Sequence, residues 1–346
     1  MNKYKICFVI PYFGKLPQDI ELFLESCKYN FNFNWILYTD DKRKLNYPNN
    51  VAVKYCTFGE FKNKIQRKFE FKIGLSTPKK LCDFKPAYGY ILEEELQEYD
   101  FWGYCDLDQL FGNLNMFITD EILEKYDKLF CLGHMTLFRN TKKINKLFMT
   151  EFEDETYLKT SYKQIFKDTK NYIFDEWPKK IININVIAKR KNIRTYYTEN
   201  ILDIIPFKSN FINIKYNVNK NIWFVYETRK NFIAVWEKGK LYAYTKNKKG
   251  NLLKKEAIYV HIQKRKIKNI EKFDNRKNNV IIITPNKYYF LEKYNEDILH
   301  GYFRRIFIRN LLKIDETKKK AQDMIFLWEY RFNKYIVSRL FAKSRV

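Results

Sequence analysis

Two aspartates one residue apart, Asp106 and Asp108, directly follow an apolar run, FWGYC at 101–105. On an extended segment, residues i and i+2 point to the same side, so both carboxylates can reach one cation. Oxygen donors of this kind bind Mg²⁺ and Mn²⁺, which usually keep water or phosphate oxygens as further ligands. The chain contains one such pair, and its place after a strand pattern and before Gly112 and Asn113 favours a metal site over a solvated turn.

Two of the three histidines stand where strand patterns end. YVHIQKRK, residues 259–266, reaches His261 and continues into lysines. CLGHMTLFRN, residues 131–140, places His134 directly after Gly133. A buried, hydrogen-bonded histidine is the structural alternative at both positions, and a ligand role is less favoured for His134 than for His261.

The elements that would position these residues alternate between strands and helices. KICFVI, residues 5–10, is a β-branched and aromatic run ended by Pro11, which predicts a buried strand. Apolar residues at helical spacing over 18–30 and a strand over 34–41 complete a β-α-β pattern. Further predicted elements are a strand near 51–56, a helix over 83–100 with Pro86 in its first turn, strands over 101–105 and 128–133, and a helix over 141–148. This alternation favours an α/β fold with parallel strands.

The pattern changes from about residue 211. The stretches IWFVYE, NFIAVWEKGKLYAY and EAIYVHI alternate apolar and polar residues, which predicts antiparallel strands, with Lys238 and Gly239 at a hairpin turn. From about residue 288 the pattern is helical.

Composition limits the class of protein. The chain has 346 residues and an apolar fraction sufficient for a sizeable core, and its net charge is +25. Because the lysines are spread over the whole chain, a basic surface is favoured over a nucleic-acid-binding stripe, and no nucleic-acid partner is expected. The six cysteines have no zinc-like spacing, so reduced, buried thiols are expected. Without a secretory-signal pattern or an apolar stretch of about 18 residues, a cytoplasmic location is expected.

The run KKLCDFKPAYGYILEEELQEYDFWGYCDLDQLFGNL resembles the donor-binding core of metal-dependent glycosyltransferases with the GT-A fold, specifically a bacterial family associated with capsular and other surface polysaccharides. The resemblance covers roughly residues 4–265. It implies that Asp106 and Asp108 hold Mn²⁺ or Mg²⁺ on the diphosphate of a nucleotide sugar, with a UDP-sugar as the expected donor.

The same resemblance implies an α/β fold of the GT-A (Rossmann-like) type, a mixed sheet with an antiparallel subregion. The expected catalytic domain covers 1–287, with a nucleotide-sugar half at about 1–135 and an acceptor half at about 136–287. Residues 288–346 would form a basic, amphipathic helical extension.

Residues after the first two strands are candidates for binding the nucleotide. Tyr12 could stack on the base while backbone groups near Pro11 bind it, and an ordinary aromatic loop residue is the alternative. Thr39 and Asp40 could bond the base or ribose, or could serve a turn or an N-cap.

Three residues near the predicted helix over 83–100 are candidates for binding the donor sugar and phosphates. They are Asp83, Lys85 and Tyr88, in a region where related families bring an acid and a base onto the donor, often with arginine in place of this lysine. A helix N-terminus adds attraction for anions. His134, next to the metal loop, would border both the donor sugar and the acceptor.

The resemblance also gives roles to residues near the end of the predicted catalytic domain. His261 is implied to be a third metal ligand, and Lys264 or Lys266 to bind phosphate. A lysine suits this role because its ammonium group is a compact point charge.

IFDEWPKK, residues 173–180, places Asp175 and Glu176 in the expected acceptor region. An inverting enzyme needs a carboxylate base at the acceptor hydroxyl, whereas a retaining one uses a carboxylate or amide to support the oxocarbenium-like state. Asp175 is the first candidate for either role, and a helix start before Pro178 is the structural alternative.

Residues 301–346 are basic and rich in aromatic residues. On a helix, Phe303, Ile306 and Phe307 share one face, which suits peripheral binding to an anionic membrane that carries a lipid-linked acceptor. Packing of this face on the catalytic domain, or on a second subunit in a homodimer, is the alternative.

The leading hypothesis is a cytoplasmic glycosyltransferase that extends a surface-polysaccharide precursor, such as a capsule or a lipopolysaccharide. A nucleotidyltransferase or metal phosphohydrolase would also use paired aspartates on an α/β sheet. A non-enzymatic module that binds RNA or a membrane is a third hypothesis, which the charge permits.

Overall fold

The computed structural model describes residues 3–152, 161–176, 182–203, 214–217, 222–226, 232–262, 279–284 and 287–311. The chain divides into two compact units, Met1–Asn200 with Tyr216–Phe224, and Ile201–Lys215 with Val225–Val346. The boundary predicted at 287 does not coincide with this division. Lys264 and Lys266 and the part of the C-terminal extension after 311 lie outside the described residues.

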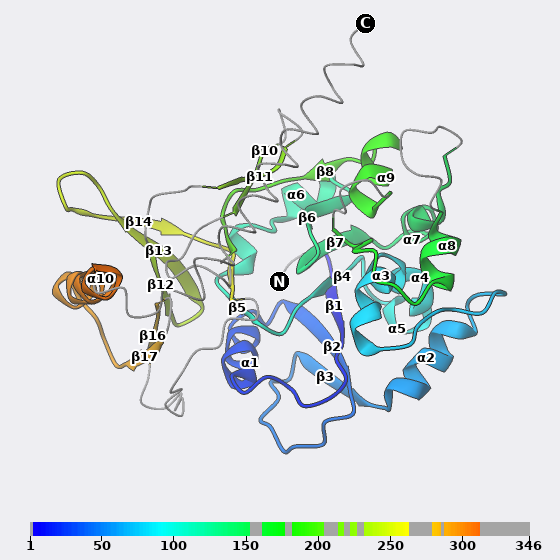
Figure 1. Cartoon of the computed structure of the whole chain (residues 1–346), viewed down its shortest axis with the longest axis horizontal. Helices are drawn as coiled ribbons and strands as arrows, with labels where there is room; N and C mark the ends of the chain where they lie inside the picture. Colours follow the sequence, from blue (N-terminus) through cyan, green and yellow to red (C-terminus); the bar gives the residue numbers. More distant parts are fainter. Residues whose placement is uncertain are drawn as a thin grey trace, which may run out of the picture. The chain divides into compact units, whose positions relative to one another are not determined.

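The first unit is built on a mixed seven-stranded sheet in the order β3-β2-β1-β4-β7-β6-β8 (Figure 1). Its strands are β1 (Ile6–Pro11), β2 (Phe33–Thr39), β3 (Val51–Tyr55), β4 (Phe101–Cys105), β6 (Lys128–Leu132), β7 (Met135–Arg139) and β8 (Thr195–Tyr196). The first four are parallel, whereas β7 runs antiparallel to β4 and to β6. The predicted strands and the α/β class are therefore confirmed.

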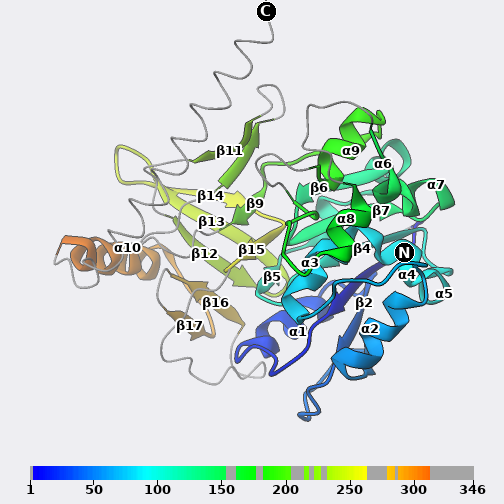
Figure 2. The ribbon, with the colours of Figure 1, turned by 45° about the vertical axis from the view of Figure 1, so that its right-hand side comes forward.

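Continuous apolar runs form β1 and β4 because helices cover both faces of this part of the sheet. Figure 2 shows α1 (Ile20–Lys28) and α2 (Phe58–Gln66) on opposite sides of β1 and β2. On the α1 side, Phe23 contacts Phe111, and Phe8 stacks on Trp35. The other face carries most of the core of this unit, and the helices with residues in that core are α2, α3 (Leu81–Phe84), α4 (Tyr88–Ile91), α5 (Glu93–Leu96), α7 (Lys142–Asn145), α8 (Tyr162–Lys167) and α9 (Ile184–Arg190).

The remaining short elements of the first unit connect these strands and helices. They are β5 (Gln109–Phe111), α6 (Asp120–Lys125) and the 3₁₀ turns η1 (Pro78–Lys80), η2 (Lys85–Ala87), η3 (Leu114–Met116) and η4 (Leu147–Met149). The helix predicted over 141–148 is thus a short α7 followed by η4.

The single helix predicted over 83–100 is wrong. The chain instead forms α3, η2, α4 and α5 in succession. Pro86 lies inside η2, where its missing N–H and its ring interrupt a regular helix. At Gly89 a Cβ atom would lie 2.2 Å from the ring of Trp102, so the close packing of this segment on β4 requires glycine.

The second unit contains an antiparallel sheet in the order β14-β13-β12-β16-β17. Its strands are β12 (Phe232–Glu237), β13 (Lys240–Lys246), β14 (Leu252–Glu256), β16 (Val280–Ile283) and β17 (Tyr288–Leu291). The hairpin predicted at Lys238 and Gly239 is confirmed, and both residues have positive φ, 44° and 81°. The unit also holds β9 (Ile201–Asp203), which pairs in parallel with β15 (Tyr259–His261). Strands β10 (Ile214–Asn217) and β11 (Ile222–Tyr226) form a separate two-stranded sheet, and the division into two units passes through both strands.

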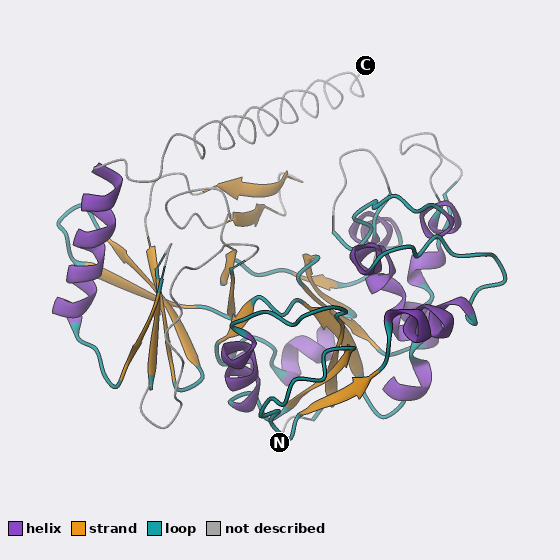
Figure 3. Ribbon diagram, turned by 60° about the horizontal axis from the view of Figure 1, so that its bottom comes forward, coloured by secondary structure: helices purple, strands orange, loops and turns teal. Residues whose placement is uncertain are grey.

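The C-terminal helix α10 (Glu296–Leu311) begins later than predicted, because residues 288–291 form β17. Figure 3 shows α10 beside the antiparallel sheet of its unit. Phe303 is buried against that sheet and Ile306 packs against the same cluster, which supports the packing alternative for these two residues. Phe307 is 65% exposed. Among the described residues, no helix combines the length and the apolar character needed to cross a bilayer.

The cysteine prediction is confirmed in part. All six cysteines are free thiols. Four of them are buried, whereas Cys56 and Cys82 are only partly buried.

Candidate active site

The candidate site lies at the carboxyl ends of β1 and β4. From β1 the chain moves outward through β2 to β3 and then returns to the other side of β1 as β4, so the strand order reverses between β1 and β4. In open α/β sheets, ligands bind outside the carboxyl ends of the strands at such a reversal. Asp106 directly follows β4, and its backbone N–H donates to the carbonyl of His134, 3.0 Å away.

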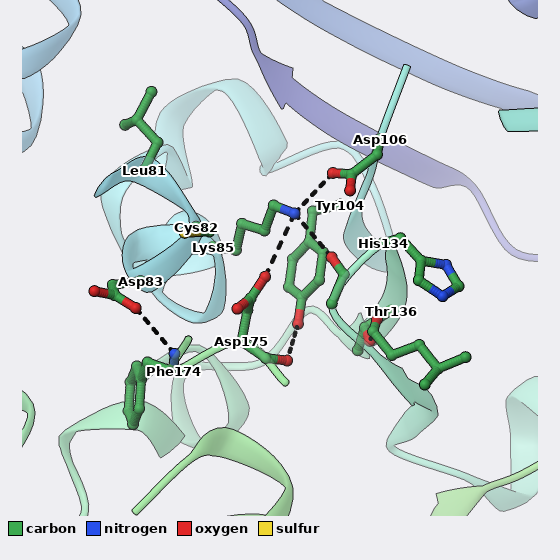
Figure 4. A network of polar contacts seen from close by, with 12 residues as sticks. Leu81, Cys82, Asp83, Lys85, Tyr104, Asp106, His134, Thr136, Phe174 and Asp175 are labelled. Carbon is green, nitrogen blue, oxygen red and sulfur yellow. Dashed lines mark hydrogen bonds and ion pairs between the residues drawn. The ribbon is translucent and has the colours of Figure 1, made fainter. Parts of the chain in front are cut away.

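The ammonium group of Lys85 joins three groups from distant parts of the sequence (Figure 4). It donates to Asp106 Oδ1 and to the carbonyl of Gly133, each at 2.8 Å. Asp175 Oδ2 lies 3.4 Å from the same Nζ atom. Lys85 therefore links the aspartate pair after β4 to the predicted acceptor carboxylate.

Burial and charge act in opposite directions on the pKa values of Lys85, which is partly buried, and of Asp175, which is buried. Burial disfavours the charge of Lys85, but Asp106 and Asp175 outweigh it and hold the pKa of the lysine well above its usual value. Burial raises the pKa of Asp175 to about 6, and the ammonium group of Lys85 offsets only part of that rise. A carboxyl group with a pKa in this range can change its protonation near neutral pH.

One side-chain oxygen of Asp175, Oδ1, is buried without a hydrogen-bond partner among the described residues. The backbone of the residue is held firmly, since its carbonyl accepts a hydrogen bond from the Tyr104 hydroxyl at 3.2 Å. A buried carboxylate oxygen with no partner is costly, which is typical of functional positions.

Gly133 leaves the space that Asp175 occupies. A Cβ atom at residue 133 would lie 2.7 Å from Asp175 Oδ2 and 3.2 Å from the Cβ atom of Glu176. We expect Gly133→Ala to displace Asp175 and to destabilise the fold by about 1–3 kcal/mol, because overpacking a buried contact forces its neighbours to shift. Chemical denaturation would measure this loss.

Gly59→Ala is the matched control for that substitution. Gly59 lies in α2, where the nearest atom to an added Cβ is Thr57 Oγ1 at 3.9 Å. Alanine should raise the free energy of unfolding there by up to about 1 kcal/mol because it favours a helix more than glycine does. Equal stability changes at the two glycines would contradict the close approach at Gly133.

Tyr12 follows β1 and lies within electrostatic reach of the aspartate pair. Burial raises the pKa of the Tyr12 hydroxyl, and the charge of Asp108 adds to the rise. Pro11 ends β1, and the N–H of Tyr12 donates to the carbonyl of Tyr38 at the end of β2. These residues lie at the edge where the sequence predicted the nucleotide.

Asp40 and Thr39 organise the loops at this edge. Asp40 Oδ1 accepts a hydrogen bond from the N–H of Gly14 at 2.7 Å, in the loop that follows β1. Thr39 is fully buried, and its hydroxyl accepts a hydrogen bond from the N–H of Asp41. The turn role weighed for Thr39 is therefore favoured over a direct contact with a nucleotide.

Asp83 and Tyr88 are fully buried, so their placement favours structural roles over contact with a sugar. The carboxylate of Asp83 bonds Lys80 and the backbone of the segment before Asp175. The Tyr88 hydroxyl donates to the carbonyl of Leu81 at 3.3 Å.

His134 is buried, and its Nδ1 atom lies 3.2 Å from the side-chain amide of Gln109. In Figure 4 its ring points away from Lys85. Glu176 is half-buried, and its carbonyl accepts a hydrogen bond from Asn185 at 2.8 Å.

His261 lies in the second unit, at the end of β15. Its Nδ1 atom lies 2.8 Å from Asp203 Oδ1, and both side chains are buried. A carboxylate that holds one ring nitrogen fixes the orientation of the imidazole, as is usual for histidines that bind metals.

Sequence reasoning missed several residues that support these groups. Gly133 and Asp203 each contact a predicted residue across a long stretch of sequence, whereas Lys80 contacts Asp83 three residues along the chain. Of these, only Asp203 could have been recognised from the sequence. It directly follows the apolar pair Ile201–Leu202, in the same way that the aspartate pair follows the apolar strand β4.

The sequence matches the model of one protein family over residues 8–292, and that family is described as a family of unknown function, DUF6625. No curated protein matches the chain.

Proposed function

The chain belongs to the DUF6625 family, and from the site in its first unit we propose that it is a metal-dependent glycosyltransferase that takes its sugar from a nucleotide sugar. The observation that carries the proposal is the place of Asp106 and Asp108, which follow β4 at the reversal of strand order. The neighbouring Tyr12 and Lys85 supply an aromatic ring and a positive charge, which suit a nucleotide and its phosphates.

The carboxylate ligands offered by Asp106 and Asp108 fit a divalent cation. The side chain of Asp106 is 37% exposed and Asp108 is half-buried, so ligand and solvent can reach the carboxylates at this sheet edge. Mn²⁺ or Mg²⁺ bound there would neutralise the diphosphate of the donor. The resemblance of the sequence to GT-A enzymes adds His261 as a third ligand, with Asp203 orienting its ring.

Within this proposal, Lys85 has two tasks. It neutralises the charge of Asp106, and it also lies beside Asp175. Its positive charge thereby reduces the electrostatic repulsion between the two carboxylates. The phosphates of a donor would compete with these carboxylates for the lysine, since phosphate oxygens accept hydrogen bonds from an ammonium group.

Asp175 is the residue proposed to act on the acceptor side. A carboxylate with a pKa of about 6 is largely ionised at neutral pH and is basic enough to assist loss of the acceptor hydroxyl proton. The proposed acceptor is a saccharide precursor of a surface polysaccharide, and the proposed site of action is the cytoplasmic side of the membrane.

A panel of nucleotide sugars, tested by thermal unfolding with and without Mn²⁺, would identify the donor. We expect a UDP-sugar to raise the unfolding temperature only when Mn²⁺ is present, because a ligand that binds the native state stabilises it, by about 2.7 kcal/mol at a hundredfold excess over Kd.

Product analysis with the same donor distinguishes the proposed reaction class from its alternatives. A glycosyltransferase without acceptor should slowly release free sugar and nucleoside diphosphate. Release of pyrophosphate or inorganic phosphate would instead identify a nucleotidyltransferase or a phosphohydrolase. The absence of a thermal shift with every donor would contradict the proposal.

A further inference from the structure

A buried ion pair lies beside the candidate site and takes no direct part in it. Lys80 Nζ and Asp83 Oδ2 are 2.7 Å apart, and the two residues are 1% and 0% exposed. The other hydrogen bonds of this ammonium group go to the carbonyls of Ile165 and Lys170. All three of its N–H donors are therefore used inside the protein.

Asp83 also binds the backbone on the approach to Asp175. Its Oδ1 atom accepts from the N–H of Phe174 at 3.0 Å, and its Oδ2 atom accepts from the N–H of Tyr172 at 2.9 Å. One carboxylate thus holds two amides that are two residues apart.

The residue between these amides, Ile173, has φ 55°. A left-handed conformation is unusual and costly for a β-branched residue, and it persists only where the surroundings hold it. Backbone N–H groups on either side of such a residue can form a concavity that binds an anion. The Asp83 carboxylate acts as that anion, and so stabilises the turn.

Asp175 follows this turn directly. From the other side, Ile184 donates to the carbonyl of Phe174, and Tyr104 donates to the carbonyl of Asp175. The direction in which the Asp175 side chain leaves the backbone is therefore fixed by the turn before it and by the hydrogen bonds around it.

We propose that Asp83, paired with Lys80, is a positioning residue that sets the location of Asp175 by binding the amides of Tyr172 and Phe174. The inference rests on the proposed catalytic role of Asp175. It gives Asp83 a function other than contact with the donor sugar, in keeping with the complete burial of its side chain.

The test compares two variants of the full chain. Asp83→Asn removes the charge, and the double variant Lys80→Met/Asp83→Leu removes both charges, so that no unpaired ion is buried. In both, we expect kcat to fall about 100-fold, because displacement of a reacting group by about 1 Å has an effect of this size. KM for the nucleotide sugar and Mn²⁺-dependent nucleotide binding should stay unchanged.

Asp168→Asn is the matched control. Asp168 accepts hydrogen bonds from the Tyr172 hydroxyl and the Lys170 N–H at the surface of the same segment. This variant should keep the wild-type kcat. Wild-type kcat in both Asp83 variants would overturn the proposal, and a raised KM with unchanged kcat would show instead that Asp83 contacts the donor.

A second readout separates this inference from the proposed function. The carboxyl carbon resonance of Asp175, followed by NMR, should move in both Asp83 variants and stay in place in Asp168→Asn, with no substrate required. If the wild-type chain transfers no sugar, the proposed function fails, and the NMR measurement still decides whether Asp83 positions Asp175. An unmoved resonance would overturn the inference.

Discussion

Asp108→Asn should abolish Mn²⁺-dependent nucleotide binding and lower turnover at least about 1,000-fold. Asparagine keeps the size of the side chain but removes the negative charge that a divalent cation needs from its ligand. Loss of the charge stabilisation at the departing diphosphate accounts for a rate effect of this order. Isothermal titration calorimetry with Mn²⁺ and a nucleoside diphosphate would measure binding, and donor hydrolysis would measure turnover.

The control for this substitution lies at the other end of the same strand. Asp100 precedes β4 and accepts a hydrogen bond from the N–H of Lys5 at 2.8 Å. Asp100→Asn should leave Mn²⁺ binding and turnover unchanged. Retained Mn²⁺-dependent binding in Asp108→Asn would refute the metal site. Asp108 is the cleaner choice because substitution of Asp106 would also remove a partner of Lys85.

Asp175→Asn is expected to lower kcat by about 100-fold to 10,000-fold, the range by which positioned acids and bases contribute to catalysis. The wild-type enzyme should gain activity as the pH rises through about 6, because the ionised carboxylate is the active form and burial raises its pKa to that value. A pH profile of kcat/KM would show this rise, and the asparagine variant should lack it.

Asp175→Asn, which should lower activity, should raise the free energy of unfolding. The pKa of Asp175 is higher in the folded protein than in the unfolded chain, so between about pH 4 and pH 6 the folded state binds more protons. Wild-type stability therefore falls over this window as the pH rises. A shift of about two pKa units corresponds to about 3 kcal/mol. Asp175→Asn should gain this amount relative to wild type between pH 4 and pH 8.

Urea denaturation at the two pH values would measure the difference. If the difference in free energy of unfolding between the wild type and Asp175→Asn is the same at both pH values, the carboxyl group titrates as it does in water. Activity that survives in the asparagine variant would remove Asp175 from the proposed reaction, whatever its effect on stability.

The sequence predicted those parts of the fold and site that depend on neighbouring residues. Strands β1 and β4 were identified because both are short, unbroken apolar runs, as fully buried parallel strands require. The position of Asp106 followed from the end of β4. The hairpin at Lys238 and Gly239 was recognised for a similar reason, because its turn signal is local.

The parts that failed depend on packing. Pro86 is compatible with the first turn of a helix, but in the folded chain it lies inside η2 and interrupts a regular helix, while Gly89 packs closely on Trp102. Asp83 has the residue type expected for a sugar contact, yet it is buried and accepts hydrogen bonds from backbone amides about 90 residues away in sequence. These contacts indicate a structural role. No local pattern reveals such distant partners.

The antiparallel pairing of β7 with β4 has a thermodynamic consequence for ligand binding. Because β7 begins where β4 ends, the connection from β6 to β7 reaches the site as only two residues, Gly133 and His134. So short a connection, with both ends fixed in paired strands, has few alternative conformations to give up. A ligand that contacts this connection therefore loses little affinity to the entropy cost of ordering it. That entropy cost was met when the chain folded.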